Sequence, residues 1–208
     1  MIRFSLCTIV KNEIKALDWW FEHLEFLTKY GLAEVNLTDT GSTDGTKNRI
    51  LEWKEMFPVP VNLYQTVLHN FGQARNFAIS KASKDIPLFF VLDIDERVLE
   101  SECGELQNML SATDISIWRV PRKKYTDLEM NNQIELDKYP DWQWRFGRND
   151  GKVKYRGLVH EGLTGGKSRN FPGPFHIHHF QPCWRTHKER HERQQLYTRL
   201  MQEQNRKQ

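Results

Sequence analysis

The stretch Leu88-Phe89-Phe90-Val91-Leu92-Asp93-Ile94-Asp95-Glu96 indicates most clearly how this chain folds. It begins with an apolar run of the kind found in strands that are buried on both faces of a parallel sheet. Asp93 and Asp95 follow two positions apart, so an extended backbone directs both carboxylates to one side while Ile94 turns into the fold. We therefore predict a buried strand that ends in a pair of acidic side chains.

Strand-like and helix-like segments alternate before this run. The expected strands are 3–10, 34–38, 59–64 and 88–92. The expected helices are one that starts at Asn12 and stops at Gly31, one that ends before Pro58, and 73–82. This alternation predicts an α/β fold in which a mostly parallel central sheet is flanked by helices on both faces.

The pattern after residue 97 is less regular and predicts a smaller, mixed or antiparallel part. From Thr186 the chain should be helical, because Thr186 and Glu189 have the spacing of a capping box. The other features expected here are short strands at 115–120, 143–146 and 153–159, an irregular insert at Arg122-Lys123-Lys124, and a flexible loop over 162–168.

Composition narrows the class of protein. The 208 residues are 38% hydrophobic and 12% aromatic, which suits one globular domain. The 30 Lys and Arg residues against 27 Asp and Glu leave a net charge of +3, which does not suggest nucleic-acid binding. Three widely separated cysteines favour a reducing compartment, and the apolar start is too short for a signal peptide or a membrane span. We expect a cytoplasmic protein.

Polar side chains follow three of the predicted strands. In an open parallel α/β sheet, ligands bind beyond the carboxyl ends of the strands, so these residues should meet at one edge. They are Asn12 and Glu13 after the first strand, Asp39, Ser42 and Asp44 after the second, and Asp93 and Asp95 after the buried one.

Each of these groups has a functional and a purely structural interpretation. The pair Asp93 and Asp95 could hold Mg²⁺ or Mn²⁺ that bridges a diphosphate, or Asp95 could simply cap a helix. Asp39 could accept the ring N–H of a pyrimidine base, or it could form a turn. Arg75 could offer a fork of donors to a phosphate or base, or it could lie on a solvated helix face.

Taken in order, these motifs resemble the family-2 glycosyltransferases of the GT-A fold. The resemblance rests on Val10-Lys11-Asn12-Glu13, Asp39-Thr40-Gly41-Ser42-Thr43-Asp44-Gly45-Thr46, Ala74-Arg75-Asn76, Leu92-Asp93-Ile94-Asp95-Glu96 and Gly157-Leu158-Val159-His160-Glu161. It implies a nucleotide-sugar donor, most often UDP-linked, and inversion at the anomeric carbon. It places the base near Asp39, with Val10, Asn12, Glu13, Ser42, Asp44 and Arg75 around the donor, and the acidic pair on ribose and metal.

The same resemblance suggests how one domain over 1–208 is organised. Residues 1–97 would bind the nucleotide sugar, 98–183 would supply the acceptor side and catalysis, and 184–208 would form a basic helix. That helix could lie on anionic lipid, contact a charged acceptor, or present a solvated face. The acceptor could be a carbohydrate, a lipid-linked molecule or a protein.

Direct displacement needs a group that takes the proton of the acceptor hydroxyl. Glu161 is our candidate, and it could instead be a surface residue; Asp137 and Asp141 are the next residues to test. His178 is the histidine we expect to complete the ligand set of the metal, while a separate zinc site is weakly supported because paired ligands occur in one place only. The competing functions are a nucleotidyltransferase that makes a nucleotide sugar, and a non-catalytic nucleotide-sugar-binding module.

Overall fold

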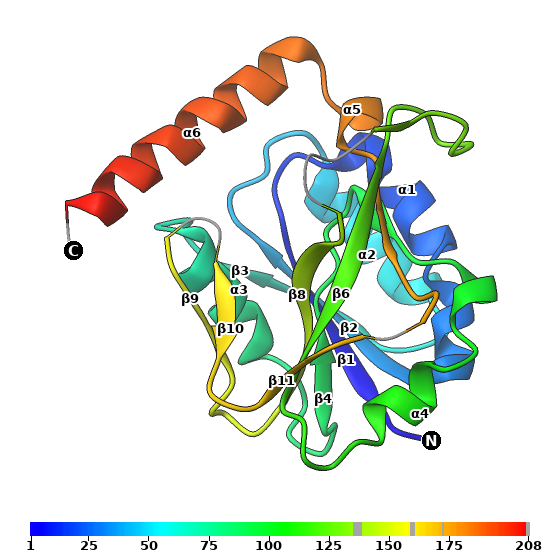
Figure 1. Ribbon diagram of the computed structural model, residues 1–208. Helices are drawn as coiled ribbons and strands as arrows, with labels where there is room; N and C mark the ends of the chain where they lie inside the picture. The colour runs from blue at the N-terminus through cyan, green and yellow to red at the C-terminus, as the bar shows by residue number, and fades with distance from the viewer. Residues whose placement is uncertain (135–138, 159–160, 172, 207–208) are drawn as a thin grey trace.

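The computed structural model describes residues 1–134, 139–158, 161–171 and 173–206, and one mixed sheet runs through it in the order β3-β2-β1-β4-β8-β6-β12-β5 (Figure 1). The strands are β1 Phe4–Val10, β2 Leu32–Asp39, β3 Val61–Gln65, β4 Leu88–Phe90, β5 Glu96–Arg97, β6 Ile117–Tyr125, β7 Gln133–Ile134, β8 Asp141–Arg148, β9 Lys154–Arg156, β10 Gly162–Thr164, β11 Ser168–Asn170 and β12 Ile177–His179. The helices are α1 Ile14–Glu22, α2 Thr46–Met56, α3 Phe71–Ile79, α4 Leu106–Leu110, α5 Gln181–Trp184 and α6 His187–Asn205, with 3-10 helices η1 Glu25–Tyr30 and η2 Glu100–Glu102.

The first part of the sheet confirms the predicted α/β fold. β1 pairs in parallel with β2 and with β4, and β2 pairs in parallel with β3. The register sets Val10 opposite Asp39, so the carboxyl ends of β1 and β2 lie side by side. The antiparallel strand β8 then joins β4 to the later strands, so the sheet continues past residue 97 without a break.

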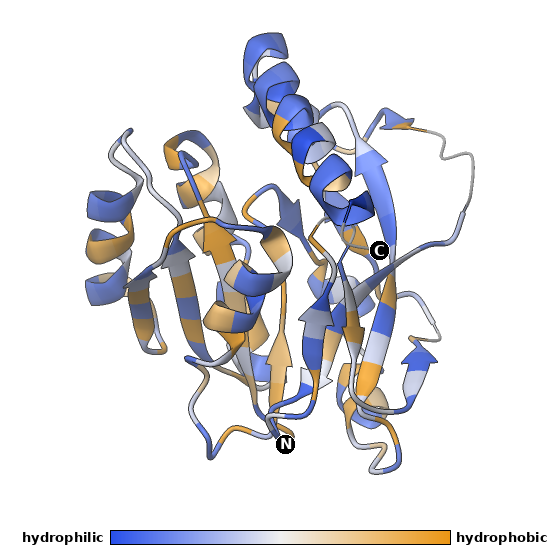
Figure 2. Ribbon diagram, turned by 90° about the vertical axis from the view of Figure 1, so that its left-hand side faces the viewer, coloured by the Kyte–Doolittle hydropathy of each residue, from blue (hydrophilic) through white to orange (hydrophobic). Residues whose placement is uncertain are grey.

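The apolar run in β4 is buried on both faces, as its composition predicts. Because successive side chains of a strand alternate, Phe90 joins the core that α1 covers, and Phe89 joins the core that α3 covers. Phe90 also stacks on Phe146 of β8, with ring centroids 4.2 Å apart. Figure 2 shows apolar residues concentrated in the strands and a mainly hydrophilic α6.

The first helix ends earlier than its apolar spacing predicts. α1 stops at Glu22, and the chain continues as the 3-10 helix η1 up to Gly31, whose φ of 104° only glycine adopts easily. Leu24 and Leu27 are nevertheless fully buried. The spacing therefore predicted correctly which side chains face the core, but it did not predict the tighter helix that carries them.

The prediction of an irregular insert at Arg122-Lys123-Lys124 is wrong. These residues lie in β6, which is paired on both sides and is one of the longest strands of the sheet. Pro121, which suggested a break, falls where β11 has ended at Arg119 and β12 has not yet begun at Arg122. Among the described residues, neither β11 nor β12 pairs with residue 121, so a proline without an N–H is tolerated there.

The prediction of a flexible loop over 162–168 is also wrong. Gly162–Thr164 forms β10 and pairs with β9, and Ser168–Asn170 forms β11 beside β6. Three residues to which the sequence drew attention, Asp137, Val159 and His160, lie outside the described residues. Among the helices that are described, none combines the length and the apolarity needed to cross a membrane.

Candidate active site

A cavity of 320 Å³ opens at the carboxyl ends of β1 and β4, where the sequence predicts a ligand site. The segment that follows β1 forms one wall, the acidic pair after β4 forms another, and α3 with the C-terminal segment completes it. The lining residues include Val10, Asn12, Glu13, Arg75, Asp93, Asp95, Arg185 and Arg193.

Hydrogen bonds fix the segment after β1 to the turn after β2. The Asn12 backbone N–H donates to Ser42 Oγ at 2.9 Å, and Asn12 Oδ1 accepts from the Thr43 N–H at 2.8 Å. The Glu13 N–H donates to Thr46 Oγ1 at 2.9 Å. Asn12 has a left-handed φ of 54°, a conformation that asparagine tolerates better than most residues. Together these contacts hold Glu13 at the rim of the cavity.

Asp39 and Asp44 organise the turn itself. The Asp39 carboxylate accepts from the backbone N–H groups of Gly41 and Ser42 at 3.1 Å. Asp44 accepts from Thr46 Oγ1 at 2.6 Å. Among the described residues of this turn, Thr40 is the one that lines the cavity. Asp39, Ser42 and Asp44 therefore do form the turn and its contacts, as their structural interpretation predicts. Their contact with a donor stays a prediction.

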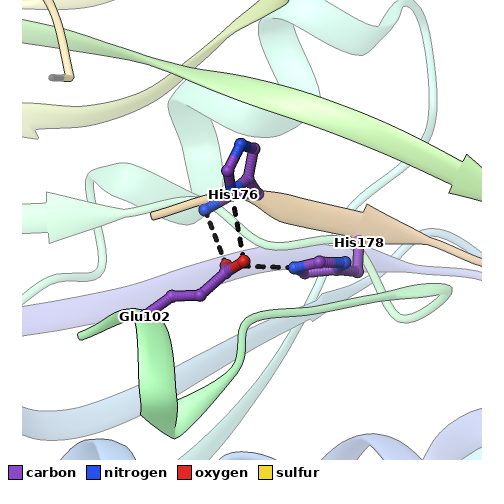
Figure 3. Close-up of side chains that lie close together, drawn as sticks. All are labelled: Glu102, His176 and His178. Carbon is purple, nitrogen blue, oxygen red and sulfur yellow. Dashed lines mark hydrogen bonds and ion pairs between the residues drawn. The ribbon is translucent and has the colours of Figure 1, made fainter. Parts of the chain in front are cut away.

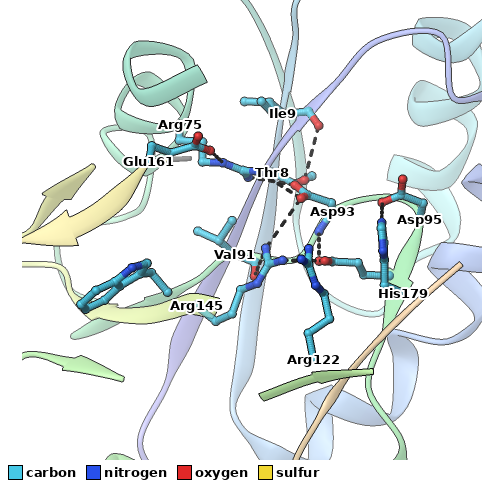
Figure 4. A network of polar contacts seen from close by, with 12 residues as sticks. Thr8, Ile9, Arg75, Val91, Asp93, Asp95, Arg122, Arg145, Glu161 and His179 are labelled. Carbon is cyan, nitrogen blue, oxygen red and sulfur yellow. Dashed lines mark hydrogen bonds and ion pairs between the residues drawn. The ribbon is translucent and has the colours of Figure 1, made fainter. Parts of the chain in front are cut away.

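Arg75 lies between two carboxylates in the network drawn in Figure 4. Its Nη1 and Nη2 donate to the two oxygens of Asp93 at 2.8 and 3.0 Å, and its Nε donates to Glu161 Oε1 at 2.6 Å. Burial alone would raise the pKa of Asp93, but Arg75 and Arg145 outweigh it and hold that pKa well below its usual range. Arg75 is thus in the site, and it is an internal contact of the network rather than a solvated helix residue.

Asp95 points away from Arg75 and meets a different set of partners. Its Oδ1 lies 3.6 Å from His179 Nε2, and its Oδ2 accepts from Arg185 Nη1 at 2.5 Å. Burial would raise the pKa of Asp95, but the opposing effect of His179 and Arg185 is larger and holds that pKa well below its usual range. The carboxylate therefore stays ionised. A buried anion of this kind requires a cation, and Arg185 supplies it here.

The donor set around Asp95 fits a divalent metal. A carboxylate and an imidazole together suit Mn²⁺ well, and the carboxylate alone suits Mg²⁺. The ring nitrogen of His179 that faces Asp95 is Nε2, 3.6 Å from Asp95 Oδ1. Asp95 and His179 are thus two candidate ligands at this cavity, with Asp93 close by, while Glu102, His176 and His178 form a separate cluster with metal-ligand geometry.

His178, the predicted metal ligand, contacts a different carboxylate. Figure 3 shows it pointing to Glu102, whose Oε2 lies 3.0 Å from His178 Nε2, and His176 Nδ1 lies 3.1 Å from the other oxygen. The prediction that His176 and His178 share one face of an extended segment is confirmed. Because side chains alternate along β12, His179 faces Asp95 and His178 lies on the other face, and a metal-binding role for either histidine stays a prediction.

A second cavity of 560 Å³ adjoins the first and shares Asp93 and Asp95 with it. Trp142 and Trp144, two apart on β8, line this cavity together with Glu161. Asp141, the other described candidate for a base, accepts two hydrogen bonds from Arg122 through one oxygen. Glu161 thus sits beside the acidic pair, in a chamber that has aromatic faces.

Glu96 and Arg145 form a buried ion pair beneath the site, with 2.5 Å between Arg145 Nη2 and Glu96 Oε1. Their side chains are 1% and 5% exposed, respectively. We expect Arg145→Met to destabilise the fold by about 3–5 kcal/mol, because it leaves Glu96 charged, buried and unpaired. Denaturant unfolding measures this loss, and Arg156→Met at an exposed position is the control. Equal unfolding midpoints for the two variants would contradict the role of the pair.

The C-terminal segment contributes two residues that the sequence did not place in the site. Arg185 also donates to Glu13, and Arg193 lies 4.0 Å from Glu13 Oε1. The sequence shows that the tail is basic, but it does not show which of the basic side chains face the cavity. The interpretation of the tail as a solvated face therefore holds for most of α6 but not for Arg185 and Arg193, which face the cavity.

Known proteins share this sequence pattern and architecture. One curated relative is a lipopolysaccharide core biosynthesis glycosyltransferase, LpsC, from Rhizobium meliloti (strain 1021), which is 30% identical over 122 residues. That match covers 58% of this chain and 42% of LpsC, so the chain spans less than half of that relative.

Solved structures of S. aureus TarS have the same fold. One aligns with a TM-score of 0.60 at 13% identity, over 86% of this chain and 37% of that one. A structure of TarS 1-349 in complex with UDP-GlcNAc aligns with a TM-score of 0.60 at 12% identity, over 85% of this chain and 58% of that one. Residues 5–186 match the family described as Glycosyl transferase family 2. The chain belongs to this family, and it has the α/β architecture that the alternation of strands and helices in its sequence predicts.

Proposed function

We propose that the protein transfers a sugar from a nucleoside-diphosphate sugar, UDP-linked, to an acceptor hydroxyl with the help of a divalent cation. The observation that carries this proposal is the meeting of Glu13, Asp95 and Arg185 at one cavity, from three distant parts of the chain. A cavity with both carboxylates and guanidinium groups suits a metal-bound diphosphate, because carboxylates bind the metal and guanidinium groups bind the phosphate oxygens. Membership of the family supports the same class of reaction.

The donor would occupy the 320 Å³ cavity. Its base would lie toward Asp39 and the turn after β2, and its diphosphate toward Asp95 and His179. A cation held there supplies positive charge to the departing diphosphate when it is bound. The structures of TarS in complex with UDP and with UDP-GlcNAc support a UDP-linked donor for this chain.

The acceptor would enter the 560 Å³ cavity, where Trp142 and Trp144 offer flat faces to sugar rings. The acceptor oxygen would bond to the anomeric carbon as the bond from that carbon to the diphosphate breaks. Glu161 would take the hydroxyl proton, and attack from the face opposite the leaving group gives inversion. The acceptor would be a carbohydrate, a lipid-linked molecule or a protein, and the relative LpsC favours a carbohydrate chain.

A panel of nucleotide sugars tests the proposal, with thermal unfolding measured in Mn²⁺ and in chelator. A ligand that binds only the native protein raises its apparent stability, so UDP-sugars should raise the midpoint in Mn²⁺ more than in chelator. Product analysis then separates the chemistries, since glycosyl transfer releases a nucleoside diphosphate and nucleotidyl transfer releases pyrophosphate. Binding without turnover over many acceptors would indicate a non-catalytic module.

Asp39→Asn tests the base-binding end. If the Asp39 carboxylate accepts the ring N–H of uracil, the variant should bind UDP more weakly by about 1.5–3 kcal/mol, the range for a hydrogen bond to a charged group. Isothermal titration with CDP provides the control, because cytosine lacks that N–H. Equal losses for UDP and CDP would mean that Asp39 acts only through the Gly41 and Ser42 N–H groups.

A further inference from the structure

The C-terminal helix α6 is docked over the candidate donor cavity. Figure 1 shows it running from α5 across the carboxyl edge of the sheet toward the β9–β10 hairpin. Tyr197 stacks on Phe71 at the start of α3, with centroids 4.8 Å apart, and Leu200 is buried beside them. Gln204 Oε1 accepts from the Leu158 N–H at 2.7 Å. The position of α6 is therefore set by contacts outside the charged site.

Two arginines of this segment face into the cavity. Arg185 is 10% exposed and donates to both Asp95 and Glu13, which follow the neighbouring strands β4 and β1. Arg193, two turns along α6, lies 4.0 Å from Glu13 and places its guanidinium over the Tyr197 ring. By contrast, Lys188 and Arg199 on the same helix are exposed and line none of the described cavities. The helix thus directs Arg193 at the site together with Glu189 and Glu192, which line the same cavity, and it has a separate solvated face.

Burying these charged side chains together contributes little to the stability of the fold, which suggests that they serve to bind a ligand. An ion pair that leaves water gives up solvation that its mutual attraction barely offsets, and an apolar contact would stabilise the docked helix at least as well. Guanidinium groups bind phosphate oxygens through paired, charge-assisted hydrogen bonds. A diphosphate in this cavity would lie between Asp95 and the arginines, which are its natural partners.

We propose that Arg185 and Arg193 bind the diphosphate of the donor, and that without donor they are the counter-ions of Glu13 and Asp95. The inference rests on the proposed function, since it requires a donor diphosphate in this cavity. With donor and cation bound, Asp95 would hold the cation in place of Arg185. The freed guanidinium would then turn to the phosphate oxygens, while α6 stays as the wall of the cavity that it already forms.

This exchange predicts two effects of opposite sign for Arg185→Ala. Mn²⁺ alone should bind roughly several-fold more tightly, because the variant lacks the guanidinium that competes for Asp95. UDP in Mn²⁺ should bind about 10- to 100-fold more weakly, because a charged hydrogen bond to the phosphates is lost. A purely structural role for Arg185 in docking α6 would weaken both.

Isothermal titration on the full chain measures these affinities, with UDP, UMP and uridine as ligands and Arg185→Ala/Arg193→Ala as the main variant. We expect the loss to be largest for UDP, smaller for UMP and absent for uridine. The matched control, Lys188→Ala/Arg199→Ala, removes the same charge from the solvated face and should bind UDP like the wild type. Arg185→Lys/Arg193→Lys keeps the charge in case the alanine variant unfolds, and should bind UDP with intermediate affinity.

The outcomes separate the two levels of the proposal. Wild-type binding of UDP together with equal binding by the alanine variant overturns the role of the arginines and leaves the proposed function intact. Equal weakening in the control pair overturns it as well, because the effect is then one of net charge. A wild-type protein that binds no UDP in Mn²⁺ overturns the proposed function and this inference together.

Discussion

Glu161→Gln should still bind UDP and lose about 10²–10⁴-fold in the rate of transfer, because glutamine keeps the shape of the side chain but cannot take a proton. The structure places this carboxylate in the aromatic cavity beside Asp93, with one oxygen accepting from Arg75 Nε. Glutamine can accept the same hydrogen bond, so the variant isolates the proton transfer from the positioning of Arg75. The measurement is the rate of UDP release with a donor and acceptor that the wild type uses.

Two controls make this result specific to Glu161. Asp141→Asn tests the neighbouring carboxylate in the same cavity and should lower transfer far less. UDP affinity of the Glu161 variant, measured by titration, should match that of the wild type. A loss of affinity as large as the loss of rate would show that Glu161 acts by holding Arg75, and near-normal transfer would assign the base to another residue, with Asp141 the next to test.

Asp95→Ala should weaken UDP binding in Mn²⁺ by more than about 100-fold, since removing a metal ligand costs more than the 10- to 100-fold loss typical of its hydrogen-bonded neighbours. In chelator the same variant should bind UDP at least as well as the wild type, because there the carboxylate has no cation to hold and competes with the phosphates for Arg185. Arg185, freed from Asp95, remains available to the phosphates. Titration in both conditions measures the difference.

Asp93→Asn is the matched comparison for this prediction. Both oxygens of Asp93 already accept from Arg75, so its loss should disturb the Arg75 network and reduce the metal dependence less than Asp95→Ala does. Equal weakening of UDP binding by Asp95→Ala in Mn²⁺ and in chelator would remove the metal role from Asp95.

The sheet and its functional edge were predictable because they depend on local patterns. The apolar run of β4 and its acidic end identify a buried parallel strand, and the alternation before it fixes the order of the elements. Once the strands are parallel, Glu13, Asp39 and Asp95 must come near one edge. No long-range contact was needed for this step, which explains why it succeeded.

The remaining site residues depend on contacts that local patterns do not specify. Whether His178 or His179 faces Asp95 is set by the register of β12 against β5, and a shift of one residue exchanges the two. Arg185 and Asp95 are 90 positions apart in the sequence. Their contact depends on the order of the later strands in the sheet, which the sequence of the second half does not indicate. The charged run in β6 was misread for a related reason, since charged residues in a strand that lines a cavity look like a loop when the cavity is unknown.

The most direct test of the central claim is the anomalous scattering of Mn²⁺ in a crystal of the protein grown with UDP. The account predicts a manganese peak between Asp95, His179 and the diphosphate, with Arg185 turned from Glu13 to the phosphate oxygens and the uracil near Asp39. A manganese peak between Glu102, His176 and His178, or UDP bound away from the carboxyl ends of β1 and β4, would contradict it.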